Sequence, residues 1–404
     1  MSTPRVVVTG VGGLSCLGKN AAENWESMRR GMCGVGPLNV PGMPDVKTAV
    51  AGQIAEIPEH NFEKRALTSM SRFGLLAAIT AGEALAQAGL DKVDDRPPMR
   101  LGTVIGVGIY GNDAVEQGYD ALHFSAKKRP EIFSVPKAMP SSAAVHVSMI
   151  HKLKGPVFGV TSACASGNHA IASALDLLRL GRADAIVAGG SDTPLTFGVI
   201  RAWEVMRILA KTACRPFSAD RDGLVLGEGS GAVVLETLES AERRGAPILA
   251  ELVGAGMSGD ASDIVAPTVE GPASAMRSCL ADAGLDPSEV DYINAHGTAT
   301  MGNDKTETRA IRDVFGAHAD KLSVSSTKSM HAHCLGASSA IEALACIHAI
   351  RDGVVPPTMN YSEPDPECDL DVTPNVARER PVSVAMSNAF AFGGSNAVVA
   401  FKAF

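Results

Sequence analysis

Short apolar runs alternate along the chain with longer segments in which apolar residues recur at helical spacing. The runs are rich in β-branched residues and predict strands at 5–10, 101–108, 156–162, 184–190, 231–236, 249–256, 292–297, 322–327 and 382–389. Continuous apolar strands are typical of sheets that are covered on both faces. Helical spacing that ends in glycine predicts helices over 73–90 and 271–285. The pattern therefore predicts an α/β fold with a parallel or mixed sheet.

The length of the chain, 404 residues, exceeds that of one simple domain and favours a core in two parts. The 41 glycines and an aromatic content of 4% indicate that backbone segments pack closely against each other. A strand, a Gly-x-Gly and a serine occur both in VTGVGGLS (8–15) and in LVGAGMSGD (252–260). This echo predicts two similar halves, 1–250 and 251–404, within one body.

The bulk properties disfavour several classes of protein. The net charge is −8 with no long run of one sign, which argues against a nucleic-acid partner. No apolar stretch reaches the roughly 18 residues of a transmembrane segment, and the first apolar run is typical of a strand rather than of a signal peptide. The 8 cysteines are scattered without Cys-x-x-Cys spacing, so we expect free thiols in a cytoplasmic protein.

Cys164 lies where a predicted strand turns into a helix. Ile171, Leu175 and Leu178 follow it at helical spacing, and Gly181 ends the helix. A helix N-terminus favours a thiolate over a thiol, and the small residues around Cys164 leave room for a substrate carbonyl. Cys164 is therefore a candidate nucleophile, and a small cysteine buried in the core is the alternative.

Two further predicted strands are followed by histidines. The first, His296, stands in the motif AHGTAT, and the second strand is followed by Lys328, His331 and His333. Glu342 lies in a helix that is apolar on most faces, where a carboxylate is costly unless it is paired, and Lys328 is the nearest partner in the sequence. Ordinary loop histidines explain each motif equally well when it is taken alone. HAHC also suits a fragment of a metal site, but no further set of ligands accompanies it.

The segment SNAFAFGGSN (387–396) follows a strand, and its glycine pair after Phe392 lets the backbone turn and approach closely, as a tight hairpin also would. Each of these segments places a reactive or flexible residue beyond the end of a buried strand, where α/β sheets form their ligand crevice. One cysteine and two histidines that arrive in this way predict one assembled site. VVVTGVGGLS (6–15) lacks the GxGxxG spacing and the acidic partner of a dinucleotide fold, so a nicotinamide site is disfavoured.

These motifs closely resemble those of the β-ketoacyl-[acyl-carrier-protein] synthases of the elongating type II kind. TSACASG (161–167) is similar to their nucleophile motif, AHGTAT (295–300) to the first histidine motif, TKSMHAHCLGA (327–337) to the lysine and second histidine motif, and SNAFAFGGSN to the gating loop. RPFSADRDGLVLGEGSG (215–231) also matches, so the resemblance covers essentially the whole chain. Within the family, GVTSACASGNHAIASA, KSMHAHCLGA and NVARERPVSVAMSNAFA look most like the rhizobial nodulation ketosynthases.

The resemblance implies a thiolase-like fold, in which two βαβαβαββ halves stack as a five-layer αβαβα sandwich. It also implies a homodimer with the acyl pocket near the dimer interface, and an acyl carrier protein as the partner that delivers both substrates. No bound metal or redox cofactor is implied, because the phosphopantetheine group belongs to the carrier protein.

The mechanism that the resemblance implies begins with transfer of an acyl chain from the carrier protein to Cys164. The backbone N–H groups of Cys164 and Phe392 are implied to form the oxyanion hole. Malonyl carrier protein then binds, loses carbon dioxide, and attacks the acyl group to give a 3-oxoacyl product two carbons longer. His296 and His333 are implied to stabilise the enolate oxygen.

The remaining implied roles fall into three groups. Lys328, paired with Glu342, would organise the histidine site. Residues implied to contact the substrate are Thr298 and Thr300 for pantetheine, Ile109 and Trp203 for the acyl tunnel, and Ala391 and Gly393 beside the gate Phe392. Residues implied to dock the acidic carrier protein are Lys128, Arg129 and Arg207, with ordinary solvated charge as the alternative. Lys64 and Arg65 lie near the family's usual basic helix position but not at it.

The chain departs from the family pattern at three places near the substrate. Ala391 replaces the usual glycine before the gating phenylalanine, and it would resist a positive φ by on the order of 1 kcal/mol if the gate required one. His331-Ala332 stands where Thr-Gly is usual, and Tyr110 stands where glycine is common. We therefore expect an unusual preference in chain length or unsaturation.

Two other classes of protein are disfavoured. A degradative thiolase uses coenzyme A and normally a second cysteine as base, whereas NAFAFGG (388–394) contains none. A non-catalytic chain-length partner subunit typically lacks the nucleophile, whereas Cys164, His296 and His333 are all present. Within the enzyme interpretation, housekeeping fatty-acid elongation competes with a specialised pathway to a nodulation lipid or a polyketide.

Overall fold

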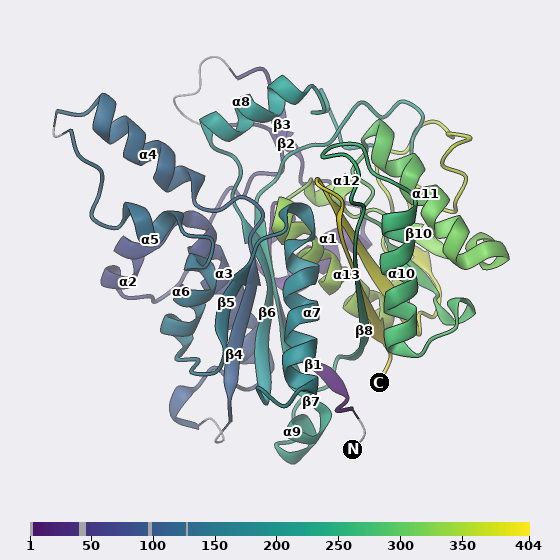
Figure 1. Cartoon of the computed structure of the whole chain (residues 1–404), viewed down its shortest axis with the longest axis horizontal. Coiled ribbons are helices and arrows are strands. Elements are labelled where there is room, and N and C mark those ends of the chain that lie inside the picture. The colour runs from purple at the N-terminus through teal and green to yellow at the C-terminus, as the bar shows by residue number, and fades with distance from the viewer. Residues whose placement is uncertain (1–2, 40–45, 96–98, 127) are drawn as a thin grey trace.

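One mixed sheet organises the protein (Figure 1). The structure is a computed structural model that describes residues 3–39, 46–95, 99–126 and 128–404. Within these residues the sheet has 10 strands in the order β10-β9-β13-β14-β8-β1-β7-β6-β4-β5. Parallel and antiparallel pairs both occur, which confirms the predicted α/β class with a mixed sheet.

The sheet is built from two sets of strands with the same pairing. The first set is β1 (Val6–Leu14), β4 (Leu101–Gly106), β5 (Val157–Val160), β6 (Ala185–Asp192) and β7 (Gly229–Thr237). The second set is β8 (Ala250–Gly259), β9 (Tyr292–Asn294), β10 (Ser323–Ser325), β13 (Val384–Ala391) and β14 (Ser395–Lys402). In the first set β5, β4 and β6 are parallel, and β7 and β1 follow antiparallel. In the second set β10, β9 and β13 are parallel, and β14 and β8 follow antiparallel.

Helices connect the strands in the same order in both sets. The first set has α3 (Arg72–Gln87), α6 (Ser142–His151) and α7 (Ser166–Arg179), and the second has α10 (Glu270–Ala283), α11 (Met301–Phe315) and α13 (Ser338–Asp352). Each set therefore reads βαβαβαββ, which confirms the duplicated thiolase-like architecture. β1 and β8, which carry the Gly-x-Gly echo, are the first strands of their sets and pair with each other over Val6–Val8 and Ala250–Leu252.

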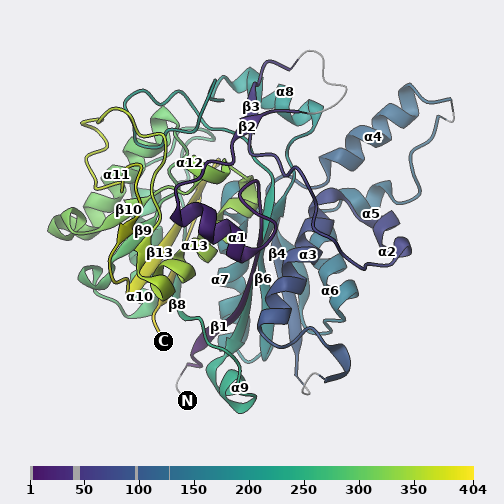
Figure 2. The same cartoon turned by 180° about the vertical axis from the view of Figure 1, so that it is seen from behind.

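Helices cover the sheet and pack between its two sets of strands (Figures 1 and 2), and three apolar clusters fill the interfaces. The central cluster joins α7 and α13 with strands of both sets, and residues 338–349 of α13 are buried on every side. α3 and α6 cover the outer face of the first set, and α10 and α11 cover the outer face of the second. The starts of α7 and α13, which follow the nucleophile and the second histidine, thus meet inside the molecule.

Shorter elements decorate this core. They are α1 (Ala21–Arg29), β2 (Gly36–Pro37), β3 (Val50–Ala51), α2 (Lys64–Ser69), α4 (Asn112–His123), α5 (Ser134–Ala138), α8 (Phe197–Met206), α9 (Leu238–Arg243), α12 (Lys328–His331), β11 (Val354–Val355) and β12 (Arg378–Glu379). Figure 1 shows α4 and α5 projecting on one side of the sheet, and α8 near the ends of β2 and β3. None of the helices formed by the described residues has the length and apolar character needed to cross a membrane.

The predicted strands are all present, and the predicted helices are α3 and α10. Both helices are followed by a glycine in the left-handed conformation, Gly89 at φ +69 and Gly284 at φ +65. The apolar pattern misses β14, because that strand begins with polar Ser395 and Asn396 directly after a glycine turn. All cysteines are free, as predicted.

Candidate active site

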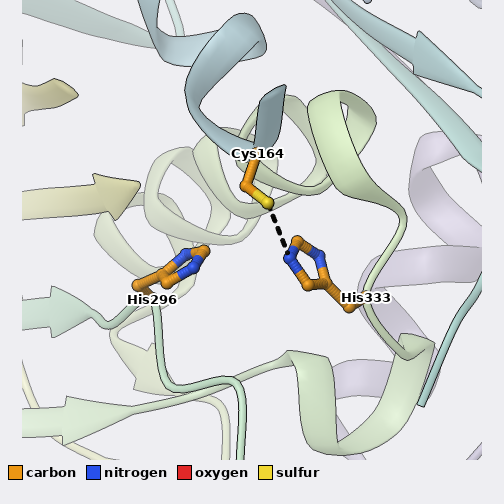
Figure 3. Close-up of side chains that lie close together, drawn as sticks. All are labelled: Cys164, His296 and His333. Atoms are coloured by element: carbon orange, nitrogen blue, oxygen red, sulfur yellow. Dashed lines mark hydrogen bonds between the residues drawn. The ribbon is translucent and has the colours of Figure 1, made fainter. Parts of the chain in front are cut away.

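Cys164, His296 and His333 converge from different parts of the chain (Figure 3). The Cys164 sulfur lies 3.2 Å from Nε2 of His333. The two imidazole rings stand nearly perpendicular, at 83°, with centroids 5.5 Å apart. All three side chains are buried. The structure therefore brings together the cysteine and both histidines that the sequence analysis selected.

A sharp strand-to-helix turn presents the Cys164 thiol. β5 ends at Val160, a 3₁₀ turn covers Ala163–Ala165, and α7 begins at Ser166. Ala163 adopts φ +48, a left-handed conformation that residues with a Cβ rarely take. The Ser166 hydroxyl accepts the Ser162 N–H at 2.9 Å, which holds the turn. Cys164 thus lies in the 3₁₀ turn directly before α7, at the head of a helix as predicted.

The protonation state of Cys164 differs from the sequence expectation. Burial raises the pKa of the thiol to about 12, although Lys328 and the backbone N–H groups of Cys164 and Phe392 lower it. The expected thiolate is therefore wrong for the resting site, because loss of solvation outweighs the field of the helix N-terminus. The resting thiol is therefore protonated at neutral pH. The same two N–H groups, both directed at the sulfur, are those of the implied oxyanion hole.

Backbone hydrogen bonds hold His333 and assign its proton. Its N–H donates to the Val225 carbonyl at 2.7 Å, and its carbonyl accepts the Gly227 N–H at 2.9 Å. Nδ1 accepts the Leu335 N–H at 3.2 Å, which places the ring proton on Nε2. Burial, and then Lys328, hold the pKa of His333 well below its usual range. A neutral imidazole therefore points an N–H donor at the thiol.

His296 is held by a buried carboxylate. Glu307 on α11 accepts the backbone N–H groups of His296 and Gly297, each at 2.8 Å. Asn388 donates to the same carboxylate at 3.1 Å. Burial, followed by the charge of Lys328, keeps the pKa of His296 well below its usual range, so this imidazole is also neutral. Its Nδ1 has no hydrogen-bond partner among the described residues.

Lys328 and Glu342 form a fully buried ion pair in which Lys328 Nζ donates to the carboxylate. Burial raises the pKa of Glu342 to about 7, while Lys328 lowers it. The lysine charge lowers the pKa of both histidines and of the thiol. The predicted pair is therefore present, and it acts on the site electrostatically from behind the histidines.

The thiol and the histidines open into a cavity of about 450 Å³. Its walls include the predicted substrate residues Trp203, Thr298, Thr300, Ala391, Phe392 and Gly393. The Thr298 and Thr300 hydroxyls are hydrogen-bonded to each other at 2.8 Å. Ile109 packs against the same apolar cluster as Cys164 and Trp203, although it does not line this cavity.

The predicted docking residues separate into two places. Arg207 lies at the cavity, and Lys305, which the sequence analysis overlooked, lines it as well. Lys128 and Arg129 are exposed between α4 and α5, outside the cavity (Figure 1). Lys64 and Arg65 are exposed on α2.

The departures from the family pattern have different structural consequences. Ala391 is the last residue of β13, pairs with Ser395, and has no positive φ in this conformation; the turn is made by Gly393 and Gly394, at φ +80 and +68. Ala332 does adopt a glycine-type conformation, at φ +64 and ψ −176. Tyr110 is 48% exposed.

Comparison with known proteins agrees with this site. Residues 3–241 match the model of the β-ketoacyl synthase N-terminal domain, and residues 249–362 match that of the C-terminal domain. The chain belongs to the β-ketoacyl synthase family. It is 58% identical over 398 residues to nodulation protein E of Rhizobium sp. (strain N33), covering 98% of this chain and 99% of that protein. It is 41% identical over 408 residues to 3-oxoacyl-[acyl-carrier-protein] synthase 2 of Staphylococcus aureus (strain N315), covering 99% and 98%.

A solved structure extends the comparison to a complex. The chain superposes with a TM-score of 0.91 and 32% identity on the structure of a type II polyketide synthase acyl-carrier protein in complex with its ketosynthase bound to the hexaketide. The superposition covers 100% of both chains. The protein is thus a condensing enzyme of the β-ketoacyl synthase family with the thiolase fold.

A thiol and two imidazoles could in principle hold a soft metal ion, since their ligand atoms lie within 4.8 Å of one another. A metal needs a lone pair on each histidine nitrogen. The Leu335 N–H already occupies the lone pair of Nδ1 in His333, so Nε2 presents a proton to the centre of the cluster. The cluster of this β-ketoacyl synthase is therefore suited to donate hydrogen bonds rather than to bind a metal.

Three buried carboxylates that hold the site were not predicted from the sequence. Glu307 fixes the His296 loop, and Asp304 one turn earlier accepts the Phe217 N–H at 2.7 Å. Both are buried on α11 three residues apart, within the stretch MGNDKTE that directly follows AHGTAT. Asp192 at the end of β6 binds three backbone N–H groups around the site. An acidic residue at the end of an otherwise mostly apolar strand, as in AIVAGGSD, was the available signal.

Proposed function

We propose that this protein is a 3-oxoacyl-[acyl-carrier-protein] synthase. It condenses malonyl carrier protein with an acyl group held on Cys164, releases carbon dioxide, and lengthens the chain by two carbons. The observation that carries the proposal is the contact between the Cys164 sulfur and the His333 Nε2–H at 3.2 Å, beside a second neutral histidine. This arrangement supplies a nucleophile and two hydrogen-bond donors in one buried cavity.

The first half-reaction moves the acyl chain onto Cys164. The sulfur forms a bond to the thioester carbon, and the pantetheine thiol leaves with the proton that Cys164 gives up. The His333 Nε2–H faces the sulfur and stabilises its developing negative charge. The N–H groups of Cys164 and Phe392 receive the carbonyl oxygen as it becomes an oxyanion.

The second half-reaction forms the carbon–carbon bond. Malonyl carrier protein loses carbon dioxide, and the electron pair of the broken bond forms a thioester enolate. His296 and His333 hold the enolate oxygen by hydrogen bonds, which requires both rings to be neutral donors. The enolate carbon attacks the acyl carbonyl, and the Cys164 sulfur leaves. Burial, reinforced by the positive charge of Lys328, keeps both histidines neutral, and Glu342 holds Lys328 in place as its ion-pair partner.

The carrier protein presents its phosphopantetheine arm as part of the substrate. Thr298 and Thr300 line the cavity with hydroxyls that can bind the amide groups of the arm. Arg207 and Lys305 line the cavity together with Asp222, Asp260 and Asp263, and these two cations are proposed as local contacts for an acidic carrier protein. Lys128 and Arg129 are proposed as additional docking points. The related ketosynthase captured with its acyl-carrier protein supports the same kind of partner.

We further propose a homodimer built on β5. This strand lies at one edge of the sheet, and Phe158 within it is 37% exposed. An uncovered edge strand offers hydrogen-bonding groups to a second copy. Phe158→Asp is expected to give monomers in light scattering, whereas Val376→Asp, at an exposed apolar residue elsewhere, is expected to leave the dimer intact. A wild-type monomer at micromolar concentration would contradict the proposal.

The enzyme is proposed to act in the cytoplasm, in keeping with free cysteines and a carrier-bound substrate. We also propose that its two halves divide near residue 250. The repeated strand order, with β8 beginning at Ala250, and family-model matches that end at 241 and resume at 249 support that division.

Two pathways remain candidates for the reaction. Fatty-acid elongation is supported by the 41% identity to a 3-oxoacyl-[acyl-carrier-protein] synthase 2, and a specialised nodulation-type pathway by the 58% identity to nodulation protein E. Growth of a bacterium that lacks its own elongating synthase separates them. Restored growth supports elongation, whereas no growth from a protein that is active in vitro supports the specialised role.

Intact-protein mass spectrometry tests the reaction class. The protein is mixed with acyl carrier proteins of graded chain length, and we expect a single acyl adduct. Cys164→Ala is expected to abolish the adduct, while Cys33→Ala, which removes an exposed thiol, is expected to retain it. An adduct that survives Cys164→Ala would overturn the assignment of the nucleophile.

A further inference from the structure

Asp192 is a buried carboxylate that none of the motifs above contains. It is the last residue of β6, and only 1% of it is exposed. Its oxygens accept the backbone N–H groups of Gly108 at 2.7 Å, Ile109 at 3.1 Å and Gly336 at 2.7 Å. The Asp192 carboxylate therefore binds segments that are far apart in the sequence and belong to different halves of the fold.

Each of these segments leads to a different part of the site. Gly108 and Ile109 follow β4, and Ile109 packs in the apolar cluster around Cys164. Gly336 directly follows Leu335, whose N–H binds Nδ1 of His333. One carboxylate thus connects the apolar cluster beside Cys164 with the turn whose Leu335 N–H orients the His333 ring.

The packing around Asp192 leaves little room for alternative arrangements. A Cβ added at Gly336 would lie 2.6 Å from the Gly108 nitrogen and 2.7 Å from the Asp192 carboxylate. A Cβ added at Gly108 would lie 2.8 Å from the same carboxylate. The glycines allow both backbones to reach Asp192 at once, so a shift of one segment is transmitted to the other.

The charge of Asp192 also acts on the nucleophile. Within the described residues its carboxylate enters no ion pair, and the three N–H groups are its hydrogen-bond donors. Burial raises the pKa of Asp192 to about 7. The charged groups that act on the Cys164 thiol are Lys328, which lowers its pKa, and Asp192, which raises it. His296 and His333 face the thiol as neutral rings.

We propose that Asp192 is a positioning residue that couples the apolar cluster around Cys164, against which Ile109 packs, to the His333 turn, so that acyl-chain fit beside Cys164 and the condensation step depend on one carboxylate. The coupling rests on the proposed function. The effect of the Asp192 charge on the Cys164 thiol does not depend on that function. Asp192 contacts no reacting atom and acts through Gly108, Ile109 and Gly336.

Asp192→Asn tests the charge and the placement together. The amide keeps the size of the side chain, loses the charge, and turns an NH₂ group toward a backbone donor. We expect Cys164 to be alkylated by iodoacetamide faster at a fixed pH, with the pH profile shifted toward lower pH, because Asp192 raises the pKa of the thiol. We expect malonyl decarboxylation to fall roughly ten- to a hundredfold because the His333 turn is displaced. The preferred acyl length in the adduct assay should change as well.

Asp192→Glu separates the two effects, because it keeps the charge and lengthens the side chain. It is expected to change the acyl-length profile and decarboxylation while the pH profile of alkylation stays that of the wild type. Glu83→Gln is the matched control, since Glu83 also binds two backbone N–H groups, those of Gly13 and Ala21, away from the cavity. This control should match the wild type in all three assays.

The alkylation assay needs no acyl substrate, so it distinguishes failure of the coupling from failure of the proposed function. A folded Asp192→Asn variant with wild-type alkylation, decarboxylation and acyl-length profiles would overturn the proposal. If Asp192→Asn does not fold, the acyl-length profile of Asp192→Glu is the deciding measurement. A wild-type profile in that variant would overturn the coupling.

Discussion

The indole of Trp203 stacks on the ring of Phe392, with centroids 5.7 Å apart and an interplanar angle of 27°. Trp203 belongs to α8 of the first half, and Phe392 follows β13 of the second, so the stack closes the cavity between them. We propose that Phe392 gates the acyl chain, so that opening the gate breaks this contact. A rotation of the backbone before Phe392 is the proposed motion.

Ala391→Gly is expected to speed acylation of Cys164 by about fivefold, which corresponds to about 1 kcal/mol of barrier. The reason is that glycine enters a positive φ without the steric cost that alanine meets. Rapid-quench mass spectrometry of the acyl adduct measures the rate. Trp203→Phe, which keeps an aromatic ring against Phe392, is the control for a change in the stack. Unchanged acylation in Ala391→Gly would show that the end of β13 does not limit the gate.

Cys164→Gln is expected to abolish acyl transfer and to retain decarboxylation of malonyl carrier protein. The substitution removes the nucleophile but leaves His296, His333 and the Lys328–Glu342 pair in place. Release of carbon dioxide and the absence of an acyl adduct are the two measurements. A folded variant that releases no carbon dioxide would refute the division of roles between the cysteine and the histidines.

Ala332→Gly is expected to change the free energy of unfolding by less than about 1 kcal/mol, because relief of the strained backbone offsets the lost methyl group and the added chain entropy. Ala343→Gly, at a buried helical position of α13, is the matched control and is expected to cost about 1–2 kcal/mol. Urea unfolding compares the two variants. Equal losses in both would mean that Ala332 stores no strain.

His331→Thr is expected to weaken the dependence of stability on pH. Burial lowers the pKa of His331 from 6.5 to about 3, so the folded state keeps this ring neutral while the unfolded chain protonates it. The contribution of His331 to the free energy of unfolding is fully present above about pH 6.5. It is lost as the pH falls toward 3, by up to about 1.4 kcal/mol per pH unit.

Urea unfolding gives the free energy of unfolding of His331→Thr and of the wild type at pH 7.5, 6 and 5. The difference between the two proteins is then compared with the slope of about 1.4 kcal/mol per pH unit that one titrating proton produces. The difference is needed because Asp192 and Asp304, whose pKa values are raised to about 7 and about 6, titrate in the same window with the opposite sign. Thr327→Ser keeps His331 and its hydrogen bond and should retain the wild-type slope. Parallel curves for His331→Thr and wild type would contradict the assignment.

Local patterns in the chain were enough to predict the strands of the large sheet apart from β14, the helices that end in glycine, and the residues that follow each predicted strand. Apolar periodicity and the backbone preferences of glycine act over a few residues, so they survive in the sequence. The placement of Cys164 at the head of α7 and the pairing of Lys328 with Glu342 follow from the same local arguments, because a buried carboxylate must find a cation.

Long-range packing settled the properties that no local pattern encodes. Burial by both halves makes the Cys164 thiol neutral, against the field of its own helix. The Leu335 N–H selects the tautomer of His333, and with it a hydrogen-bond donor instead of a metal ligand. Glu307 and Asp192 became recognisable once their backbone partners were located. Solvation and hydrogen bonding depend on every atom within a few ångströms, and those atoms come from segments far apart in the chain.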